Sequence, residues 1–129
     1  MLSLATLVAS IGAIFLLTQG VARPELWEIP AGYQGWVLVQ HSDPSCPRTD
    51  SQGIFEVIRV SADGRACTSS DIARGWFYAR YQYVDDGKRT DIDDRSVNSG
   101  HVNWSAARSA FFVGPSDKAD PTTLPPDWR

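Results

Sequence analysis

The sequence has little of what most enzymes and nucleic-acid-binding proteins are built from. Its 129 residues carry 12 Lys and Arg against 15 Asp and Glu, so it lacks the basic surface that binds nucleic acid. Only two histidines and two cysteines occur. The nucleophile elbow G-x-S-x-G, the metalloprotease motif H-E-x-x-H, the phosphate-binding loop and the dinucleotide fingerprint are all missing. These absences disfavour nucleic-acid binding, and neither a catalytic residue nor a cofactor is predicted.

The first residues have the composition of a secretory leader. Residues 2–17 contain no charged side chain, and small residues then precede Arg23. Cleavage is expected after Ala22 or after Gly20, which predicts a signal peptide over 1–22 and a secreted or periplasmic protein without a membrane span. The alternative is an uncleaved leader that anchors the chain, although the apolar run is shorter than the ~20 residues of a spanning helix.

Cys46 and Cys67 both follow this leader, and an exported chain favours a disulfide between them. A bridge closing a loop of this length contributes about 3 kcal/mol. The alternatives are two free thiols or half of a metal site. Because zinc takes about four ligands and no His or Cys pair has finger spacing, no metal site is predicted.

Short apolar segments alternate with Gly, Pro and Asp turns throughout residues 23–114, and no helical period persists for three turns outside the leader. The expected strands are 25–29, 36–41, 54–60, 66–69, 76–84, 89–92, 101–104 and 109–113. About seven short strands predict one all-β domain, an antiparallel β-sandwich rather than a small barrel. Beyond Gly114, four prolines without an apolar period predict a flexible Pro-rich tail over 115–129.

The longest expected strand, 76–84, supplies the candidate binding residues. Its odd positions are apolar or aromatic and its even positions are more polar, so Tyr78 and Arg80 are expected on a wetter face. Together with Trp76 and Trp104, they could stack against a sugar ring or a partner's side chain. The alternative is that these tryptophans are packed in the core. A protein or glycan partner bound through one sheet face is the resulting hypothesis.

The two histidines are the natural bases of a competing hypothesis, a small secreted hydrolase. His41 precedes Ser42 and Asp43, but neighbours on an extended chain point to opposite faces, so this trio cannot converge locally. His41 is therefore expected to be a surface histidine at a strand end. His101 has no catalytic motif around it.

Two further features lie near residue 90. Asp91, Asp93 and Asp94 form the densest acidic group, but they lack the glycine turn and distal Glu of a known calcium loop, which favours a solvated loop. The short, charged segment 89–92 is typical of an edge strand. A third hypothesis is therefore assembly of copies through this edge.

Four motifs together resemble an uncharacterised bacterial family, a domain of unknown function. They are I-P-x-G-Y-x-G-W at 29–36, Asp-Gly at 63–64 followed by hydroxyl residues at 68–70, the aromatic strand and turn at 75–89, and F-F-V-G at 111–114. The resemblance covers most of the mature chain and implies a prealbumin-like or immunoglobulin-like sandwich, as in accessory domains of exported proteins. It implies no catalytic residue. The leading hypothesis is thus an exported, non-enzymatic binding or structural module of the cell envelope.

Overall fold

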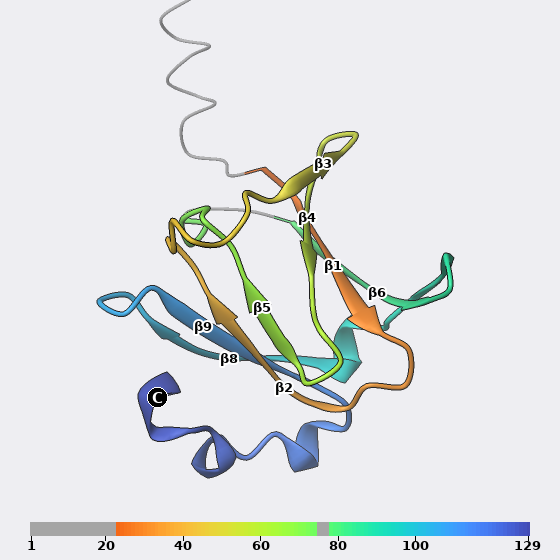
Figure 1. Cartoon of the computed structure of the whole chain (residues 1–129). Coiled ribbons are helices and arrows are strands. Elements are labelled where there is room, and N and C mark those ends of the chain that lie inside the picture. Colours follow the sequence, from red (N-terminus) through yellow and green to blue (C-terminus); the bar gives the residue numbers. More distant parts are fainter. Residues whose placement is uncertain (1–22, 75–77) are drawn as a thin grey trace, which may run out of the picture.

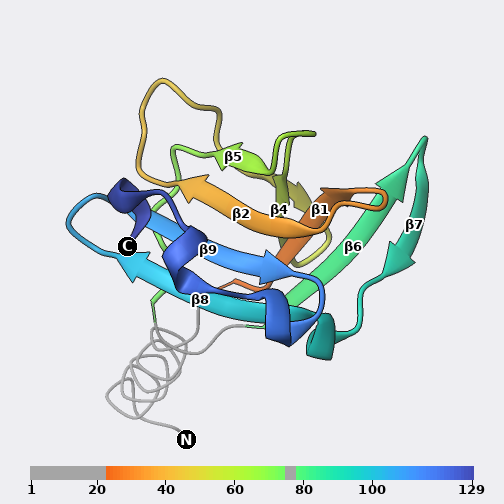
Figure 2. The same ribbon diagram turned by 90° about the horizontal axis from the view of Figure 1, so that it is seen from below.

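Two β-sheets face each other in the computed structural model, which describes residues 23–74 and 78–129 (Figure 1). One sheet has five strands in the order β3 (Asp50–Gln52), β4 (Phe55–Arg59), β1 (Glu25–Pro30), β6 (Ala79–Asp85) and β7 (Lys88–Asp91). The other has four, in the order β5 (Arg65–Cys67), β2 (Gly35–Gln40), β9 (Arg108–Val113) and β8 (Val97–Asn103). Figure 2 shows the four-stranded sheet and the β6–β7 hairpin from below. The predicted all-β sandwich is confirmed.

Both sheets are mixed, whereas the sequence predicted antiparallel pairing. β1 pairs in parallel with both β4 and β6, and β2 pairs in parallel with β5. The reason lies in the turns that follow β1 and β4, each of which carries the chain to the other sheet. After Pro30, Gly32 and Gly35 have φ of 77° and 136°, values that only glycine adopts readily. Strands that are consecutive in sequence therefore become neighbours across the sandwich.

The expected hairpin between β6 and β7 is present. Asp86 and Gly87 have φ of 46° and 83°, as a two-residue type I′ turn requires. β7 is exposed along its whole length and lies at the edge of its sheet, as the charged segment predicted. The period-two prediction holds for Ala79, Tyr81 and Tyr83, which pack against the core. Gln82 differs, because it is buried on the outer face beneath charged neighbours.

The core fills the space between the sheets and draws on the inner face of each. Its fully buried aliphatic residues are Ile29 of β1, Val37 and Val39 of β2, and Val113 of β9. Trp27 and Phe111 extend the core toward the end of the sandwich where β1 begins. This end is where the inner faces carry polar side chains as well.

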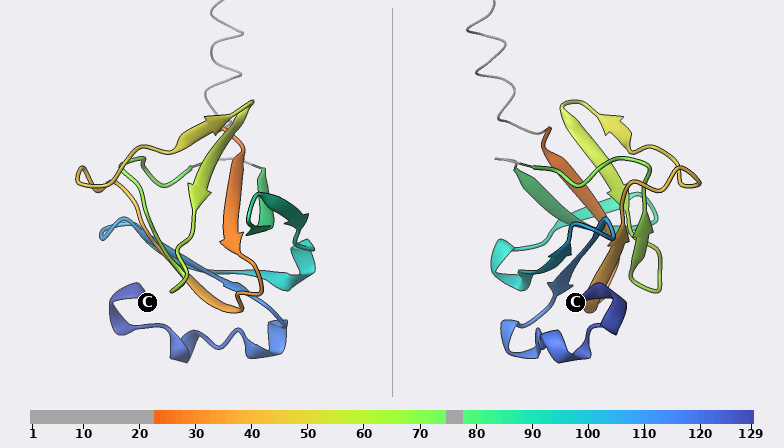
Figure 3. Two further views of the ribbon diagram at one scale, coloured as in Figure 1. Left: turned by 45° about the vertical axis from the view of Figure 1, so that its right-hand side comes forward. Right: turned by 90° about the vertical axis from the view of Figure 1, so that its left-hand side faces the viewer.

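The Pro-rich tail is ordered against the fold, contrary to the prediction of a flexible segment. Its 3-10 turns η2 (Ser116–Lys118), η3 (Pro121–Thr123) and η4 (Pro126–Trp128) run along the outer face of the four-stranded sheet (Figure 3). Leu124, only 1% exposed, and Trp128 pack there with Leu38 and Ala110. Burial of these two large apolar side chains orders the tail even though its sequence has no regular apolar period. The prolines fix the φ angles of the short turns.

The predicted leader, residues 1–22, and Trp76 lie outside the described residues. Within the described ranges, no helix has both the length and the apolar character needed to cross a membrane.

Candidate functional site

A cavity of about 500 Å³ lies between the two inner faces at the end of the sandwich where β1 and β9 begin. The five-stranded sheet contributes Glu25, Trp27 and Tyr81 to its wall. The four-stranded sheet and the segments around it contribute His41, Gly100, Val102, Trp104, Ser109, Ala110 and Phe111. The segment between β5 and β6 contributes Ile72, Ala73 and Arg74. Most of this wall is apolar, with a few polar groups placed among aromatic rings.

Three aromatic rings form the inner wall of the cavity. The ring centroids of Trp27 and Phe111 lie 4.9 Å apart with planes at 73°, and those of Tyr81 and Phe111 lie 5.3 Å apart at 62°. Such edge-to-face contacts fix the orientation of each ring. At the rim, the guanidinium of Arg74 lies 4.2 Å from the ring centroid of the half-exposed Trp104. These contacts within the protein hold the aromatic side chains of the wall in place.

Glu25 is the buried carboxylate of the cavity. Its position on β1 has the same parity as Trp27, so its side chain faces inward, and its Oε2 accepts a hydrogen bond from Trp27 Nε1 at 3.1 Å. Burial raises the pKa of Glu25 to about 7, the bond from Trp27 partly opposes this, and the negative charge of Glu56 adds to it. Glu25 thus titrates near neutral pH.

Tyr81 lies beside it on β6. Burial, followed by the charges of Glu25 and Asp94, raises the pKa of Tyr81 to about 12. Its hydroxyl keeps its proton at physiological pH.

His41 is buried in the same cavity, which corrects the expectation of a surface histidine. It follows β2 on the inward parity, and its Nε2 lies 2.8 Å from Ser109 Oγ on the neighbouring strand β9. Burial lowers the pKa of His41 to about 4, although the charge of Asp71 opposes the shift. The imidazole is therefore neutral at pH 7, and Ser109 donates to Nε2 when the ring proton is on Nδ1.

The local trio does not converge, as predicted. Ser42 donates instead to Asp71 at 2.5 Å, and Asp43 accepts from Ser45. His101 lies in β8 and is not among the residues that line the cavity.

The predicted binding residues do not form one site. Tyr78, 62% exposed, and Arg80 lie together beside the Asp91 loop, whereas Trp104 stands at the rim of the cavity. Both Nε and Nη2 of Arg80 donate to the Asp91 carboxylate at 3.0 Å. Trp76 falls in the gap between the described ranges, so its part in the prediction stays untested.

Two of the three carboxylates of the acidic group have their oxygens engaged by the protein. Asp91 accepts from Arg80 and Gln82, and Asp93 accepts from the backbone N–H and the side chain of Arg95. These bonds hold the pKa of both carboxyls below the usual value. The arrangement favours the solvated loop, since the carboxylate oxygens of Asp91 and Asp93, which calcium would need, already have partners.

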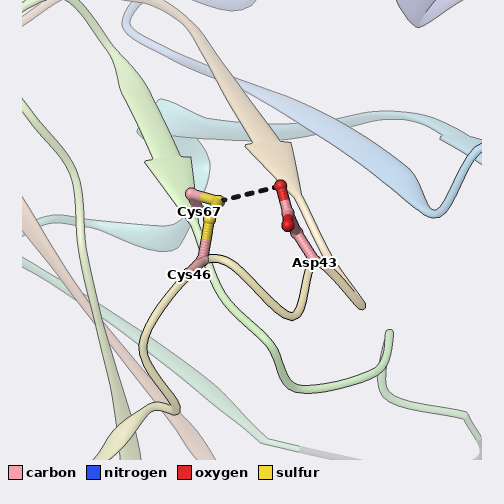
Figure 4. Close-up of side chains that lie close together, drawn as sticks. All are labelled: Asp43, Cys46 and Cys67. Atoms are coloured by element: carbon pink, nitrogen blue, oxygen red, sulfur yellow. Dashed lines mark hydrogen bonds between the residues drawn. A yellow bond between two sulfur atoms is a disulfide. The ribbon is translucent and has the colours of Figure 1, made fainter.

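The predicted disulfide between Cys46 and Cys67 is present, with a Cα–Cα distance of 5.8 Å. Figure 4 shows Asp43 beside it, with Oδ2 of Asp43 3.9 Å from Sγ of Cys67. A bonded sulfur has no proton to donate and no thiolate to offer a metal, so this cluster acts as a covalent staple between the loop after β2 and the end of β5.

Sequence reasoning missed most of the cavity: Glu25, Trp27, Tyr81, Ser109 and Phe111 were not proposed as site residues. One signal was available. An acidic residue stands at position 25 with the same strand parity as Trp27 and Ile29, where an apolar residue is normal.

The protein is thus a β-sandwich domain of two sheets with a cavity between them at one end. The chain belongs to a family of unknown function (DUF6843), whose sequence model matches residues 22–114. The predicted uncharacterised family is confirmed at this level, while the prealbumin likeness stays a prediction.

A crystal structure from Bacillus anthracis, described as a "Putative Lipoprotein", has a similar fold. The TM-score is 0.64 at 22% identity, covering 83% of this chain and 84% of that chain, so the likeness is one of fold. No curated protein matches the sequence.

Proposed function

We propose that this protein is an exported, non-enzymatic binding module that holds a small, largely apolar ligand in the cavity between its sheets. The observation that carries the proposal is the cavity itself, about 500 Å³ in volume and walled by fixed aromatic rings with a few convergent polar groups. Pockets of this size and character are typical of small-molecule sites. The proposed ligand site is therefore the interior cavity, whereas the sequence favoured an exposed sheet face. Binding of a protein or glycan partner on the outer face is the competing possibility.

Export is supported by the apolar segment 2–17 and by the disulfide, which persists in oxidising compartments. The fold-related Bacillus anthracis protein is itself described as a "Putative Lipoprotein", which accords with a location in the cell envelope. We place the protein outside the cytoplasm, secreted or periplasmic, with attachment through an uncleaved leader as the alternative. Both cysteines of the chain are joined to each other, so neither offers a site for a lipid.

A small hydrolase is the second candidate, and the 2.8 Å contact between His41 Nε2 and Ser109 Oγ favours it. The pair faces the cavity, as a nucleophile and its base would. Against this, a general base works best with a pKa near the working pH, and the pKa of His41 is lowered to about 4. We therefore rank binding above catalysis.

The test of binding uses the uncharged fluorescent probe N-phenyl-1-naphthylamine and the chain produced with its own leader in an exporting host. We expect a saturable rise in fluorescence with one site per chain. Ala73→Phe places a ring at the cavity wall and should abolish the rise. Ala62→Phe, on an exposed turn away from the cavity, is the matched control and should leave it unchanged. Unsaturable fluorescence, or equal binding by both variants, would contradict the proposal.

A further inference from the structure

We propose that the ligand is an organic cation, an ammonium group on an apolar body, whose charge is balanced by the carboxylate of Glu25. This inference rests on the proposed function, because it names the class of ligand that the cavity takes. It is carried by three features: a buried carboxylate with no cationic partner among the residues that the structure describes, the aromatic wall beside it, and the distribution of the other charges.

The first feature is a contrast within β1 between Glu25 and Glu28. Each is 8% exposed, but they face opposite sides of the sheet. Glu28 is held by Arg59 at 2.7 Å and by Arg89 at 2.5 Å on the outer face. Glu25 faces the cavity, and among the described residues its side chain is hydrogen-bonded to the neutral indole of Trp27. A buried carboxylate is normally paired, so the missing cation is a role for the ligand.

The second feature is the wall of rings around that carboxylate. Trp27, Tyr81 and Phe111 present aromatic surface to the cavity, and aromatic faces attract ammonium groups through their negative quadrupole. The rim already shows one such contact within the protein, between the Arg74 guanidinium and Trp104. A ligand ammonium deeper in the cavity would combine ring contacts with the charge of Glu25.

The third feature is what surrounds Glu25. Glu56, its register partner on β4, is also acidic and has its own pairing with Arg23 at 4.0 Å. His41 and Tyr81, which share the cavity, are neutral at pH 7 because burial lowers the pKa of one and raises that of the other. Arg74 lines the cavity, but among the described residues it forms no ion pair with Glu25. Once Glu25 has lost its proton, as at pH 8, the inner end therefore repels anions and accepts a cation.

The test compares two competitors of the same shape that differ only in charge. They are (2-hydroxyethyl)trimethylammonium and its carbon isostere 3,3-dimethylbutan-1-ol, each used to displace N-phenyl-1-naphthylamine from the full chain at pH 8. We expect the cation to reach half-displacement at a concentration about tenfold lower than the neutral isostere. Glu25→Gln, which keeps the shape of the side chain, should bring this ratio close to one. Glu28→Gln removes an equally buried carboxylate from the other face of β1 and should keep the ratio.

Each outcome has a distinct meaning. Equal displacement by both compounds, or displacement by neither while the probe still binds, overturns the cation inference and leaves the cavity as a binding site. A ratio that survives in Glu25→Gln also overturns it, because the preference then comes from elsewhere. Failure of the probe to bind wild-type protein refutes the proposed function itself. The wild-type comparison needs no variant, so a folding defect in either variant does not remove the test.

Discussion

Trp36 and Thr123 join the C-terminal tail to the sheet: the indole Nε1 of Trp36 donates a hydrogen bond to Thr123 Oγ1 at 2.8 Å. The same indole meets Phe112 edge to face at 5.4 Å, so the tail is fastened to a ring that is itself fixed in the sheet. The tail thereby covers the outer face of the four-stranded sheet, although it lies beyond the residues that the family model matches.

Leu124→Ala should therefore destabilise the fold by about 2–5 kcal/mol, the usual cost of truncating a buried leucine, measured by urea unfolding. Leu124 is 1% exposed, whereas Ile54 is 70% exposed and provides the control. Ile54→Ala should change the free energy of unfolding by less than about 0.5 kcal/mol. Equal effects of the two substitutions would show that the tail does not pack as described.

The free energy of unfolding should depend on pH through Glu25 and His41, and the two contributions should have opposite signs. The pKa of Glu25 rises from 4.5 to about 7 on folding, so its stabilising contribution is complete below pH 4.5 and is lost as pH rises through 7. The pKa of His41 falls from 6.5 to about 4, so its contribution is present above pH 6.5 and is lost as pH falls through 4. Between pH 4.5 and 6.5 the two slopes oppose each other.

The substitution Glu25→Gln removes the contribution of Glu25 to the pH dependence of the unfolding free energy. Relative to wild type, the variant should gain about 3 kcal/mol of unfolding free energy between pH 4 and pH 8, because wild type alone must bury a charge at the higher pH. Urea unfolding at several pH values measures the difference. A difference that stays constant with pH would mean that Glu25 does not titrate in the folded protein near neutrality.

The proposal of a non-enzymatic binding module predicts that the His41 and Ser109 pair is not catalytic. Hydrolysis of p-nitrophenyl butyrate at pH 7.5 should be equal in wild type, Ser109→Ala and His41→Gln, because a histidine with a pKa near 4 is a weak base at this pH. The His41→Gln, His101→Gln double variant tests both histidines together. A loss of activity greater than about tenfold on Ser109→Ala would instead support the hydrolase.

The disulfide should be a structural staple. Replacing Cys46 and Cys67 together by Ala should lower the free energy of unfolding by about 3 kcal/mol, since the bridge closes a segment of 21 residues. Reductant should destabilise wild type by a similar amount and leave the double variant unaffected. Wild-type stability in the double variant would mean that the loop after β2 is held without the bridge.

The parts of this fold that the sequence predicts are those set by local chemistry. Alternation in β6 and the left-handed turn at Asp86 and Gly87 are readable because each depends on neighbouring residues. The parallel pairing of β1 with β4 and β6 cannot be predicted in this way, because it depends on which of the two sheets the chain enters after each turn. The tail was mispredicted because packing on a distant sheet, not local propensity, orders it.

The candidate site was harder to predict for the same reason. His41 and Ser109 are 68 residues apart and meet only through the register of β2 with β9. Glu25 could have been suspected from its parity with Trp27, but the cavity beside it is lined by residues of both sheets and of the segment around Arg74, which only the tertiary fold brings together.

The most direct test of the central claim is an amide chemical-shift titration of the isotope-labelled protein with N-phenyl-1-naphthylamine. We predict saturable shifts at Trp27, Tyr81 and Phe111, which line the cavity, and none at Lys118 or Asp117 in the tail. Shifts confined to the outer face around Tyr78 and Arg80, or no saturable shift at all, would contradict a ligand site between the sheets.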